Sequence, residues 1–268
     1  MHKSNLIKIM EAAAIKASRG LVRDFGEVEN LQVSRKGVGD FVTSADLRSE
    51  RVLMRELEKA REGYSILSEE SGFTQGTDDE YCWIIDPLDG TTNFMHGIPY
   101  FCVTIALEKK ISDVKKEIVA GVTYAPISNE MFWAEKGEGA FAGDRRITVS
   151  IRDSFEGGMF SSYPWHKRNG ENNIEPACRE ISNRAGNVRV IGSAALELAY
   201  VAAGKIDGFW HDSLKSWDMA AGILLVKEAR GIVSDISNGD KMLDSGSIIA
   251  TNASIDQDVR SVIKKFCT

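Results

Sequence analysis

The sequence predicts a layered protein of mixed helices and strands, in the α/β or α+β class. Segments with apolar residues three or four positions apart indicate amphipathic helices, and short apolar runs between turn residues indicate strands. The two kinds of segment do not alternate strictly, which favours stacked layers over an all-parallel, doubly wound sheet. With 268 residues, the chain is long enough for one domain, residues 1–268, built of two closely joined lobes.

The first part of the chain predicts two amphipathic helices with extended chain between them. The first helix has lysines between apolar residues at helical spacing, namely Leu6, Ile9, Met10, Ala13 and Ala17. Residues 31–43 predict two short extended pieces around a Lys-Gly-Val-Gly turn. The second helix covers about residues 45–61, and one side of it carries Leu47, Val52, Leu53 and Leu57.

The middle of the chain is rich in predicted strands, and the last third mixes both kinds of element. Strands are expected at residues 64–67, 81–85, 103–108, 117–124 and 130–134, with a turn and a further strand at 137–141. Two apolar helices follow at 194–203 and 218–229, with strands at 208–210, 231–234 and 247–250 and a closing helix at 257–266. The boundary between the lobes is expected near residues 143–154, where the sequence turns polar.

Composition and charge limit the classes of partner. The formal net charge is −6, so the overall field of the protein attracts neither nucleic acid nor an anionic membrane. The four cysteines form no C-x-x-C pair, which predicts reduced thiols in a cytoplasmic protein. The first 20 residues contain no continuous apolar stretch and no run of ~18 apolar residues occurs, so we expect neither a signal peptide nor a membrane span.

The most informative segment for function is WIIDPLDGTT, residues 83–92. An apolar strand places Asp86 at its end, and Pro87 favours an extended backbone at Asp86. The chain then turns, which brings the carboxylates of Asp86 and Asp89 together. Gly90 permits an unusual φ, and the N–H groups that follow it can open a helix facing an anion. The segment therefore predicts two hard oxygen ligands for Mg²⁺ beside an anion-binding backbone.

Three further acidic segments are ambiguous when each is taken alone. The segment SEESG, residues 68–72, follows an apolar strand, but paired glutamates are usually solvated. Asp218 stands where the N-cap of the next helix is expected, and it could serve only as a cap. Asp46 could cap the helix after it or orient a catalytic group. Each gains a functional meaning only if the fold places it beside Asp86.

The sequence lacks the motifs of several other enzyme classes. The histidines at positions 2, 96, 166 and 211 have no metal-ligand spacing, and no G-x-S-x-G motif marks a serine nucleophile. Neither a G-x-x-x-x-G-K-[ST] loop nor a dinucleotide-binding glycine motif occurs. An enzyme acting on nucleoside triphosphates or dinucleotides is therefore not supported.

In their order along the chain, the four acidic segments resemble motifs of the inositol monophosphatase family, which belongs to the metal-dependent, lithium-sensitive phosphatases. The matching segments are Asp40–Asp46 (D-x-V-T-x-x-D), Ser68–Ser71 (GEES-like), Asp86–Thr91 (DPxDGT) and Trp217–Ala221 (WDxAA). The stretch that begins at Gly192-Ser193-Ala194 is similar to the bacterial branch of the family. The likeness runs from about residue 5 to 260. It implies a layered αβαβα sandwich like that of fructose-1,6-bisphosphatases, and a homodimer.

The resemblance also implies two to three Mg²⁺ ions per subunit. Glu69, Asp86 and the carbonyl group of Leu88 are expected to hold one ion, and Asp86, Asp89 and Asp218 a second. A third, weaker ion is expected to contact Glu69. Clustered carboxylates repel one another without cations, so we expect the metal-free site to be looser or partly protonated.

The catalytic group implied by the resemblance consists of Asp46, Thr91 and Glu69. Asp46 and Thr91 are expected to form a hydrogen-bonded pair that helps to deprotonate the attacking water, and the N–H groups of Gly90 and Thr91 are expected to bind the phosphate. Elementary chemistry agrees, because a phosphate monoester repels hydroxide and has a poor leaving group. Two metal ions about 4 Å apart activate water and stabilise the leaving oxygen.

The substrate contacts implied by the resemblance are Asp89, Gly192, Ser193, Ala194, His211 and Asp212. His211 departs from the family pattern, in which a glutamate often stands seven positions before the aspartate of the WD motif. A carboxylate accepts two or more hydrogen bonds from substrate hydroxyl groups, whereas neutral imidazole accepts one and donates one. Either Asp212 takes over the role of the glutamate or the preferred alcohol differs.

Three alternatives stay open for the function. The leading interpretation is hydrolysis of the phosphate monoester of a small polyol, with inositol 1-phosphate as the first candidate. The metal chemistry would be unchanged in a phosphatase acting on fructose-1,6-bisphosphate or on a phosphoadenosine phosphate. The bacterial branch also includes protein partners in transcription and RNA processing, so a transcription-machinery protein is a possible partner. No direct contact with nucleic acid is expected.

Overall fold

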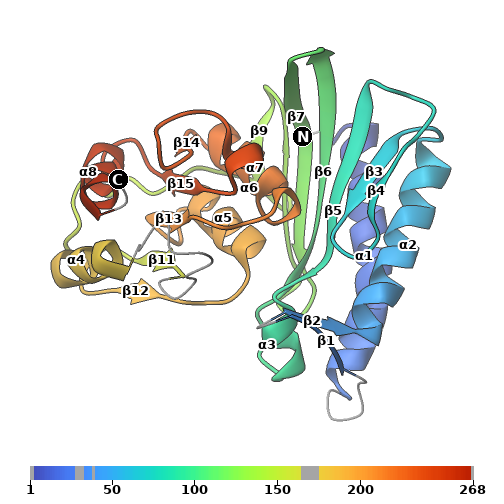
Figure 1. The fold of residues 1–268 in the computed structure, drawn as a ribbon, viewed down its shortest axis with the longest axis horizontal. Coiled ribbons are helices and arrows are strands. Elements are labelled where there is room, and N and C mark those ends of the chain that lie inside the picture. The colour runs from blue at the N-terminus through green and yellow to red at the C-terminus, as the bar shows by residue number, and fades with distance from the viewer. Residues whose placement is uncertain (1–2, 28–32, 38–39, 164–174, 267–268) are drawn as a thin grey trace.

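Two long helices form one outer layer of the molecule (Figure 1). The computed structural model describes residues 3–27, 33–37, 40–163 and 175–266. Helix α1 (Asn5–Phe25) is capped by Ser4, whose hydroxyl group accepts a hydrogen bond of 3.1 Å from the N–H of Ile7. Its buried face includes Met10, Ala13 and Ala17, as the helical spacing predicts. Helix α1 packs against α2 (Ser44–Ala60) and against the large sheet.

The buried face of α2 changes from polar to apolar along the helix. Its buried residues are Ala45, Asp46, Ser49, Glu50, Leu53 and Leu57. Leu47 was expected on this face but is 40% exposed, because the buried stripe starts one position earlier. The polar half of the stripe points to the site described below, whereas Leu53 and Leu57 join the hydrophobic core between the helices and the sheet.

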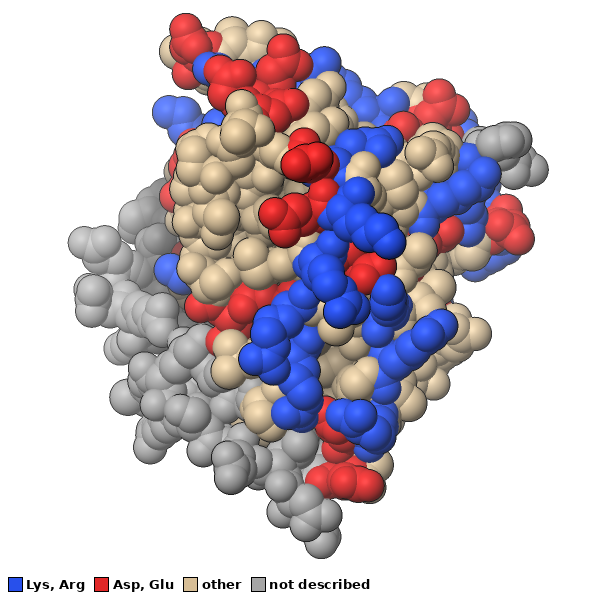
Figure 2. Space-filling model, turned by 90° about the vertical axis from the view of Figure 1, so that its right-hand side faces the viewer, with Lys and Arg blue, Asp and Glu red and all other residues tan. Residues whose placement is uncertain are grey.

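The outer surface of α1 and α2 carries a band of lysine and arginine side chains (Figure 2). Two carboxylates form hydrogen bonds with these cations and so link the two helices. Asp24 accepts hydrogen bonds from Arg23 on its own helix and from Arg48 on α2, at 2.9 and 2.6 Å. Glu56 of α2 accepts one of 2.7 Å from Lys16 of α1. The band therefore contains pairs that bridge α1 and α2, although the net charge of the chain is negative.

The second layer is an eight-stranded sheet. Its strands are β3 (Ser65–Ser68), β4 (Gly72–Thr74), β5 (Tyr81–Asp89), β6 (Cys102–Ser112), β7 (Lys115–Ala125), β8 (Glu130–Glu135), β9 (Gly139–Ala142) and β10 (Arg145–Ile147). The order is β10-β9-β8-β7-β6-β5-β3-β4, and the pair β3 and β5 is parallel whereas the other neighbouring pairs are antiparallel. The parallel pair brings the ends of β3 and β5 to the same edge, so the segments that follow them lie together.

Two apolar helices fill the middle layer, α5 (Ala194–Ala202) and α6 (Ser216–Glu228). A helix that is apolar on all sides is typical of a buried position. Small residues allow α6 to approach the sheet closely, because a Cβ atom added at Gly121 of β7 would lie 3.0 Å from the Cα of Ala221. Together with side chains from both neighbouring sheets, the two helices form the largest core cluster of the described residues.

The remaining two layers are a five-stranded sheet and an outer pair of helices (Figure 1). The strands are β11 (Phe160–Ser162), β12 (Val188–Arg189), β13 (Gly208–His211), β14 (Ile232–Ser234) and β15 (Ile248–Thr251), in the order β12-β11-β13-β15-β14. Helices α4 (Glu175–Ala185) and α8 (Asp256–Phe266) pack on their far side around a separate core cluster. The expected layered αβαβα sandwich is therefore confirmed.

Four short elements complete the described chain. Strands β1 (Val33–Gly37) and β2 (Asp40–Thr43) form a separate antiparallel pair within the region predicted to be extended. Helices α3 (Thr91–Met95) and α7 (Met242–Ser245) are single turns. Among the described residues, no helix is both long and apolar enough to cross a membrane.

Sequence patterns did not predict α4, β11 and β12, which lie between β10 and α5 along the chain. β11 and β12 have only three and two residues, too few for a periodic pattern. Along the chain, the large sheet ends at Ile147 and the small sheet begins at Phe160. The boundary at residues 143–154 and the single-domain organisation stay predictions.

Candidate active site

The carboxylates of Asp86 and Asp89 lie at an irregularity near the end of β5. The register between β5 and β6 shifts between these two residues, as at a β-bulge. Pro87 fits this position because it has no N–H group to pair with the neighbouring strand. One carboxylate oxygen of Asp86 accepts a hydrogen bond of 2.9 Å from the N–H of Leu88. The turn predicted from the sequence is thus a bulge within a buried strand.

Helix α6 brings a third carboxylate to this bulge. Carboxylate oxygens of Asp86, Asp89 and Asp218 all lie within 4.8 Å of one another. The expectation that Asp218 is an N-cap is wrong, because α6 begins at Ser216 and Lys215 occupies the cap position. Asp218 is the third residue of the helix, and its carboxylate accepts a hydrogen bond of 2.7 Å from the N–H of Lys215. The capping bond orients this carboxylate while leaving it beside the two aspartates of β5.

A second acidic group forms beside the first. Carboxylate oxygens of Asp46, Glu69 and Glu70 also lie within 4.8 Å of one another. Asp46, in the first turn of α2, is 1% exposed. Glu69 follows β3, whose parallel pairing with β5 places it near Asp86, and its negative charge raises the pKa of Asp86. The fold therefore places Glu69 near Asp86, with Glu70 beside it, which is the arrangement in which this glutamate pair has a functional role.

The electrostatics of this region disfavour negative charge in the absence of a cation. Burial raises the pKa of Asp86 well above its ordinary value, and the neighbouring carboxylates raise it further. Burial also raises the pKa of Asp89, and burial together with the charge of Asp89 raises that of Asp218. Closely spaced carboxylate oxygens are the ligands that hard divalent cations prefer. The donor set therefore fits a hard divalent cation, which the group of Asp86, Asp89 and Asp218 would hold with Glu69 beside it.

These pKa shifts predict how Mg²⁺ stabilises the protein. Because the folded, metal-free form holds protons that the unfolded chain loses above about pH 4, its free energy of unfolding falls as the pH rises through the raised pKa values. Mg²⁺ replaces these protons, so the gain in melting temperature on adding Mg²⁺ is expected to be larger at about pH 8 than at about pH 5. Differential scanning fluorimetry at both pH values measures the gain. A gain that is equal or larger at the acidic pH would contradict the assignment.

The backbone after β5 forms a tight corner at Gly90. This residue has a φ of +95°, which glycine adopts readily and other residues rarely do, and it caps helix α3. A Cβ atom at this position would lie 3.0 Å from the carbonyl oxygen of Tyr100 and 3.1 Å from that of Gly192. The hydroxyl group of Thr91 donates a hydrogen bond of 2.9 Å to the carbonyl oxygen of Leu88. The pairing of Thr91 with Asp46 stays a prediction, as does phosphate binding by the N–H groups.

The start of α5 contacts Asp89. The hydroxyl group of Ser193 and the N–H of Ala195 donate hydrogen bonds of 2.6 and 2.8 Å to the same carboxylate oxygen of Asp89. The thiol of Cys102 lies 3.8 Å from that oxygen. Gly192, Ser193 and Ala194 were expected to contact the substrate, and this stays a prediction. The structure adds that Ser193 orients one of the clustered aspartates.

His211 ends β13 and is 3% exposed. Its Nδ1 atom accepts a hydrogen bond of 3.0 Å from the N–H of Ser213, so the neutral imidazole carries its proton on Nε2. The ring lies 5.2 Å from that of Tyr163, measured between centroids. The carboxylate of Asp212 lies 4.0 Å from Nδ1. The substrate contacts expected of His211 and Asp212 stay predictions.

Sequence reasoning missed several polar residues that hold the acidic segments in place. The hydroxyl group of Ser49 donates a hydrogen bond of 2.9 Å to the carbonyl oxygen of Pro87, and Glu50 accepts bonds from both the N–H and the hydroxyl group of Ser71. The side-chain amide of Asn93 donates bonds of 2.8 Å to two carbonyl oxygens, those of Tyr100 and Ile191. Polar residues at the buried positions of α2 were the sequence feature that could have indicated these contacts.

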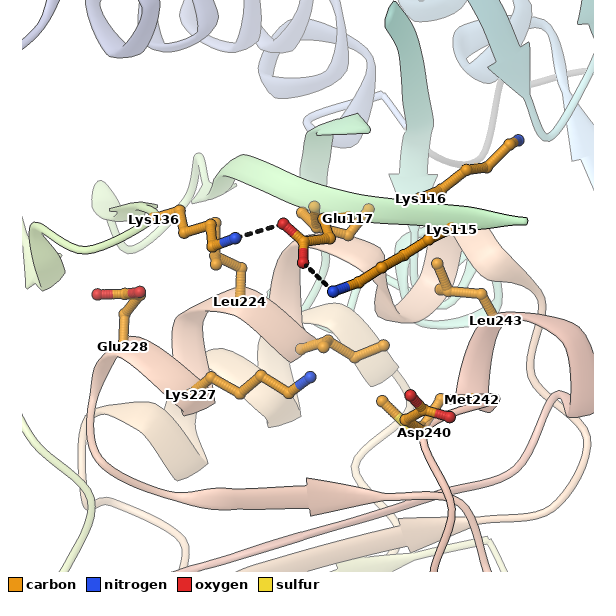
Figure 3. A pocket seen from close by; sticks show the side chains of 12 residues that line it. Lys115, Lys116, Glu117, Lys136, Leu224, Lys227, Glu228, Asp240, Met242 and Leu243 are labelled. Atoms are coloured by element: carbon orange, nitrogen blue, oxygen red, sulfur yellow. Dashed lines mark hydrogen bonds and ion pairs between the residues drawn. The ribbon is translucent and has the colours of Figure 1, made fainter. Parts of the chain in front are cut away.

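A separate pocket of about 330 Å³ lies at the other end of α6 (Figure 3). Its lining is Lys115, Lys116, Glu117, Ile118, Lys136, Ile223, Leu224, Lys227, Glu228, Asp240, Met242 and Leu243. Glu117 forms ion pairs with Lys115 and Lys136, and Glu228 accepts hydrogen bonds from the N–H groups of Gly137 and Gly139. None of the residues predicted to be functional lines this pocket.

Comparison with known proteins agrees with this geometry. The model of the inositol monophosphatase family matches residues 2–265. The chain is 48% identical over 266 residues to an inositol-1-monophosphatase of Mesorhizobium japonicum, covering 99% of this chain and 98% of the relative. It is 38% identical over 248 residues to the Nus factor SuhB of Escherichia coli K12, covering 92% and 91%.

A solved structure gives the same result for the fold. The crystal structure of the extragenic suppressor protein suhB from Bartonella henselae superposes with a TM-score of 0.92 at 46% sequence identity, covering 98% of this chain and 99% of that one. The resemblance drawn from the four acidic motifs is confirmed. The chain belongs to the inositol monophosphatase family, whose members are phosphoric monoester hydrolases.

Proposed function

We propose that this protein is a Mg²⁺-dependent phosphatase that hydrolyses the phosphate monoester of a small polyol, with inositol 1-phosphate as the leading substrate. The observation that carries the proposal is the group of three carboxylates from β5 and α6 beside the tight corner at Gly90. The names of relatives at 44–48% identity support the choice of substrate.

In this proposal, acidic residues of the chain hold the metal ions. Asp86, Asp89 and Asp218 hold Mg²⁺, while Glu69 and the carbonyl group of Leu88 complete the ligand set of a further ion, giving two to three ions per subunit. When bound, Mg²⁺ supplies the positive charge that activates water and stabilises the oxygen of the departing alcohol.

The remaining residues handle the phosphate and the proton. The N–H groups of Gly90 and Thr91 hold the phosphate oxygens, as N–H groups at a helix start do for anions. Asp46 and Thr91 act as a hydrogen-bonded pair, in which the hydroxyl group of Thr91 passes the proton of the attacking water to the carboxylate of Asp46. Glu69 lies beside Asp46. His211 and Asp212 face the hydroxyl groups of the alcohol, next to the segment Gly192-Ser193-Ala194.

A substrate panel tests the choice of substrate. Phosphate release is measured with inositol 1-phosphate, fructose-1,6-bisphosphate, a phosphoadenosine phosphate and glycerol 2-phosphate, each with and without Mg²⁺. We expect Mg²⁺-dependent release that is fastest with inositol 1-phosphate. A different leading substrate would move the proposal to another phosphatase of the same group.

His211 is the residue expected to tune the preference among alcohols. Replacing it as His211→Glu adds a carboxylate that accepts two or more hydrogen bonds from vicinal hydroxyl groups. We expect the KM for inositol 1-phosphate to fall by about 5- to 10-fold, the effect of roughly one added hydrogen bond, with kcat little changed. Steady-state kinetics of both proteins measure this. An unchanged KM would exclude contact between position 211 and the alcohol, and a higher KM would show that the carboxylate adds no hydrogen bond to the alcohol.

A second function is suggested by the relative named Nus factor SuhB. As a protein partner of the transcription machinery, this chain would act as a cytoplasmic homodimer, through its surface rather than its acidic site. Binding of the purified chain to RNA polymerase and its elongation factors, measured by size-exclusion chromatography with light scattering, tests both the partner and the dimer. Elution as a monomer that binds none of these proteins would exclude this function.

A further inference from the structure

Glu197, in the first turn of α5, is a fully buried carboxylate that the proposed mechanism does not use. It lies between the small sheet and the chain that leads into α5. Its neighbours on the helix are apolar or small, and a carboxylate in such surroundings is costly to ionise. Burial raises its pKa to about 7, even though several hydrogen bonds favour the charged form. A group held at this cost needs a structural or functional explanation.

The two oxygens of this carboxylate join two separate segments. Oε1 accepts hydrogen bonds from the N–H groups of Gly192 and Ser193, at 2.9 and 3.2 Å. Oε2 forms a hydrogen bond with the hydroxyl group of Ser161, on strand β11. Glu197 therefore fixes the turn before α5 relative to the small sheet.

That turn is the segment that orients Asp89. The N–H of Ser193 donates a hydrogen bond to Glu197, and its hydroxyl group donates one of 2.6 Å to Asp89. Next to it, the carbonyl oxygen of Ile191 accepts a bond of 2.8 Å from the side chain of Asn93 in α3. A continuous chain of contacts thus runs from Ser161 through Glu197 and Ser193 to Asp89.

We propose that Glu197 is a positioning residue for the metal site, which holds the Gly192–Ser193 turn so that Ser193 keeps Asp89 in its ligating orientation. The inference deepens the proposed function and rests on Asp89 being a metal ligand. Partners of metal ligands fix their orientation, and their loss typically lowers metal affinity by about 10- to 100-fold. Here the hydroxyl group of Ser193 is the partner of Asp89, and Glu197 fixes that partner.

The hydrogen-bond pattern around Ser161 indicates which replacement preserves this role. The single hydroxyl proton of Ser161 faces two acceptors, Glu197 and the carbonyl oxygen of Arg189 at 3.1 Å. With glutamine at position 197, the side-chain carbonyl oxygen still accepts both N–H bonds. Its NH₂ group donates to Ser161, which in turn donates to Arg189. Glu197→Gln is therefore expected to keep the turn in place, whereas Glu197→Ala removes all three bonds.

Asp207 provides a matched control. Like Glu197 it is a buried carboxylate with three partners, accepting hydrogen bonds from Ser150, Arg152 and the N–H of Met159 at 2.6, 3.2 and 2.8 Å. These contacts join the segment after β10 to the start of β13, and none of them reaches the acidic group. Asp207→Ala is expected to lower stability without changing metal affinity.

The test is isothermal titration calorimetry of Mg²⁺ into the full-length wild-type protein, Glu197→Ala, Glu197→Gln and Asp207→Ala, with folding checked by circular dichroism. We expect the Kd for Mg²⁺ to rise by about 10- to 100-fold in Glu197→Ala and to stay within about fivefold of wild type in the other two. Should Glu197→Ala not fold, Glu197→Asp replaces it, because the shorter carboxylate cannot reach the turn and Ser161 together. A rise of at least about fivefold is then expected.

Three results distinguish failure of this inference from failure of the proposed function. Wild-type affinity in folded Glu197→Ala, or in Glu197→Asp where that variant is used, would overturn the positioning role while leaving the metal site intact. An equal loss in Asp207→Ala would overturn it too, by showing a general effect of instability. No binding of Mg²⁺ by the wild-type protein would refute the proposed metal site itself.

Discussion

Asp89→Asn is expected to lower kcat/KM for phosphate release at saturating Mg²⁺ by at least about a thousandfold, since a metal-held charge at the reacting phosphate contributes several kcal/mol to catalysis. The amide keeps the size of the side chain but removes a charge from the group of three carboxylates. In the wild-type protein, Ser193 and Ala195 donate hydrogen bonds to the carboxylate of Asp89. The amide of the variant can place an NH₂ group against these donors. Steady-state kinetics over a range of substrate concentrations at saturating Mg²⁺ measure the loss.

The control for Asp89→Asn is Asp235→Asn. Asp235 is also buried, at 6% exposure, and accepts hydrogen bonds from the N–H groups of Gly239 and Lys241. It lies in the turn after β14, outside both acidic groups. We expect near wild-type turnover for this variant. Turnover of Asp89→Asn within about tenfold of the wild type would remove Asp89 from the catalytic machinery.

Gly90→Ala is expected to cause the second large loss, about a hundredfold in kcat/KM, because it distorts the corner proposed to hold phosphate. An alanine at φ +95° is strained, and its Cβ atom would lie 3.0 to 3.2 Å from the backbone of Tyr100, Gly192 and Phe101. The chain must therefore move at the start of α3, where misplacement by about 1 Å is enough to cost this factor. The free energy of unfolding should fall by about 1–3 kcal/mol.

Gly97→Ala separates backbone strain from the effect on the site. Gly97 also has a positive φ, +68°, but a Cβ atom there has no neighbour within 4 Å. Both variants carry the strain of a left-handed backbone, whereas only Gly90→Ala meets the atoms around the proposed phosphate site. Chemical denaturation and steady-state kinetics of the two variants are compared. A loss of activity in Gly97→Ala as large as in Gly90→Ala would show that strain alone is responsible.

The sequence predicts the layered architecture well because the decisive signals are local. The periodicity along α1, the apolar composition of α6 and the alternation of apolar runs with turns do not depend on distant contacts. The same reasoning misplaced Leu47 and missed β11, since the buried stripe of α2 starts with polar residues and β11 has three residues. Such features depend on what the rest of the fold places against them.

In the candidate site too, some features could be predicted from one short segment and others could not. The pairing of Asp86 with Asp89 could be predicted from one short segment, because proline and glycine fix the turn around them. The position of Asp218 at the third residue of α6, the nearness of Asp46 to Glu70, and the contact of Ser193 with Asp89 required the packed structure. Each joins segments that are far apart in sequence, and no local pattern carries that information.

Phosphate release from inositol 1-phosphate by the wild-type protein, with Mg²⁺ and after its removal by a chelator, tests the central claim most directly. The account predicts rapid release with Mg²⁺, no measurable release without it, and recovery when Mg²⁺ is restored. Release that is unaffected by the chelator, or no release from a folded protein that binds Mg²⁺, would contradict it.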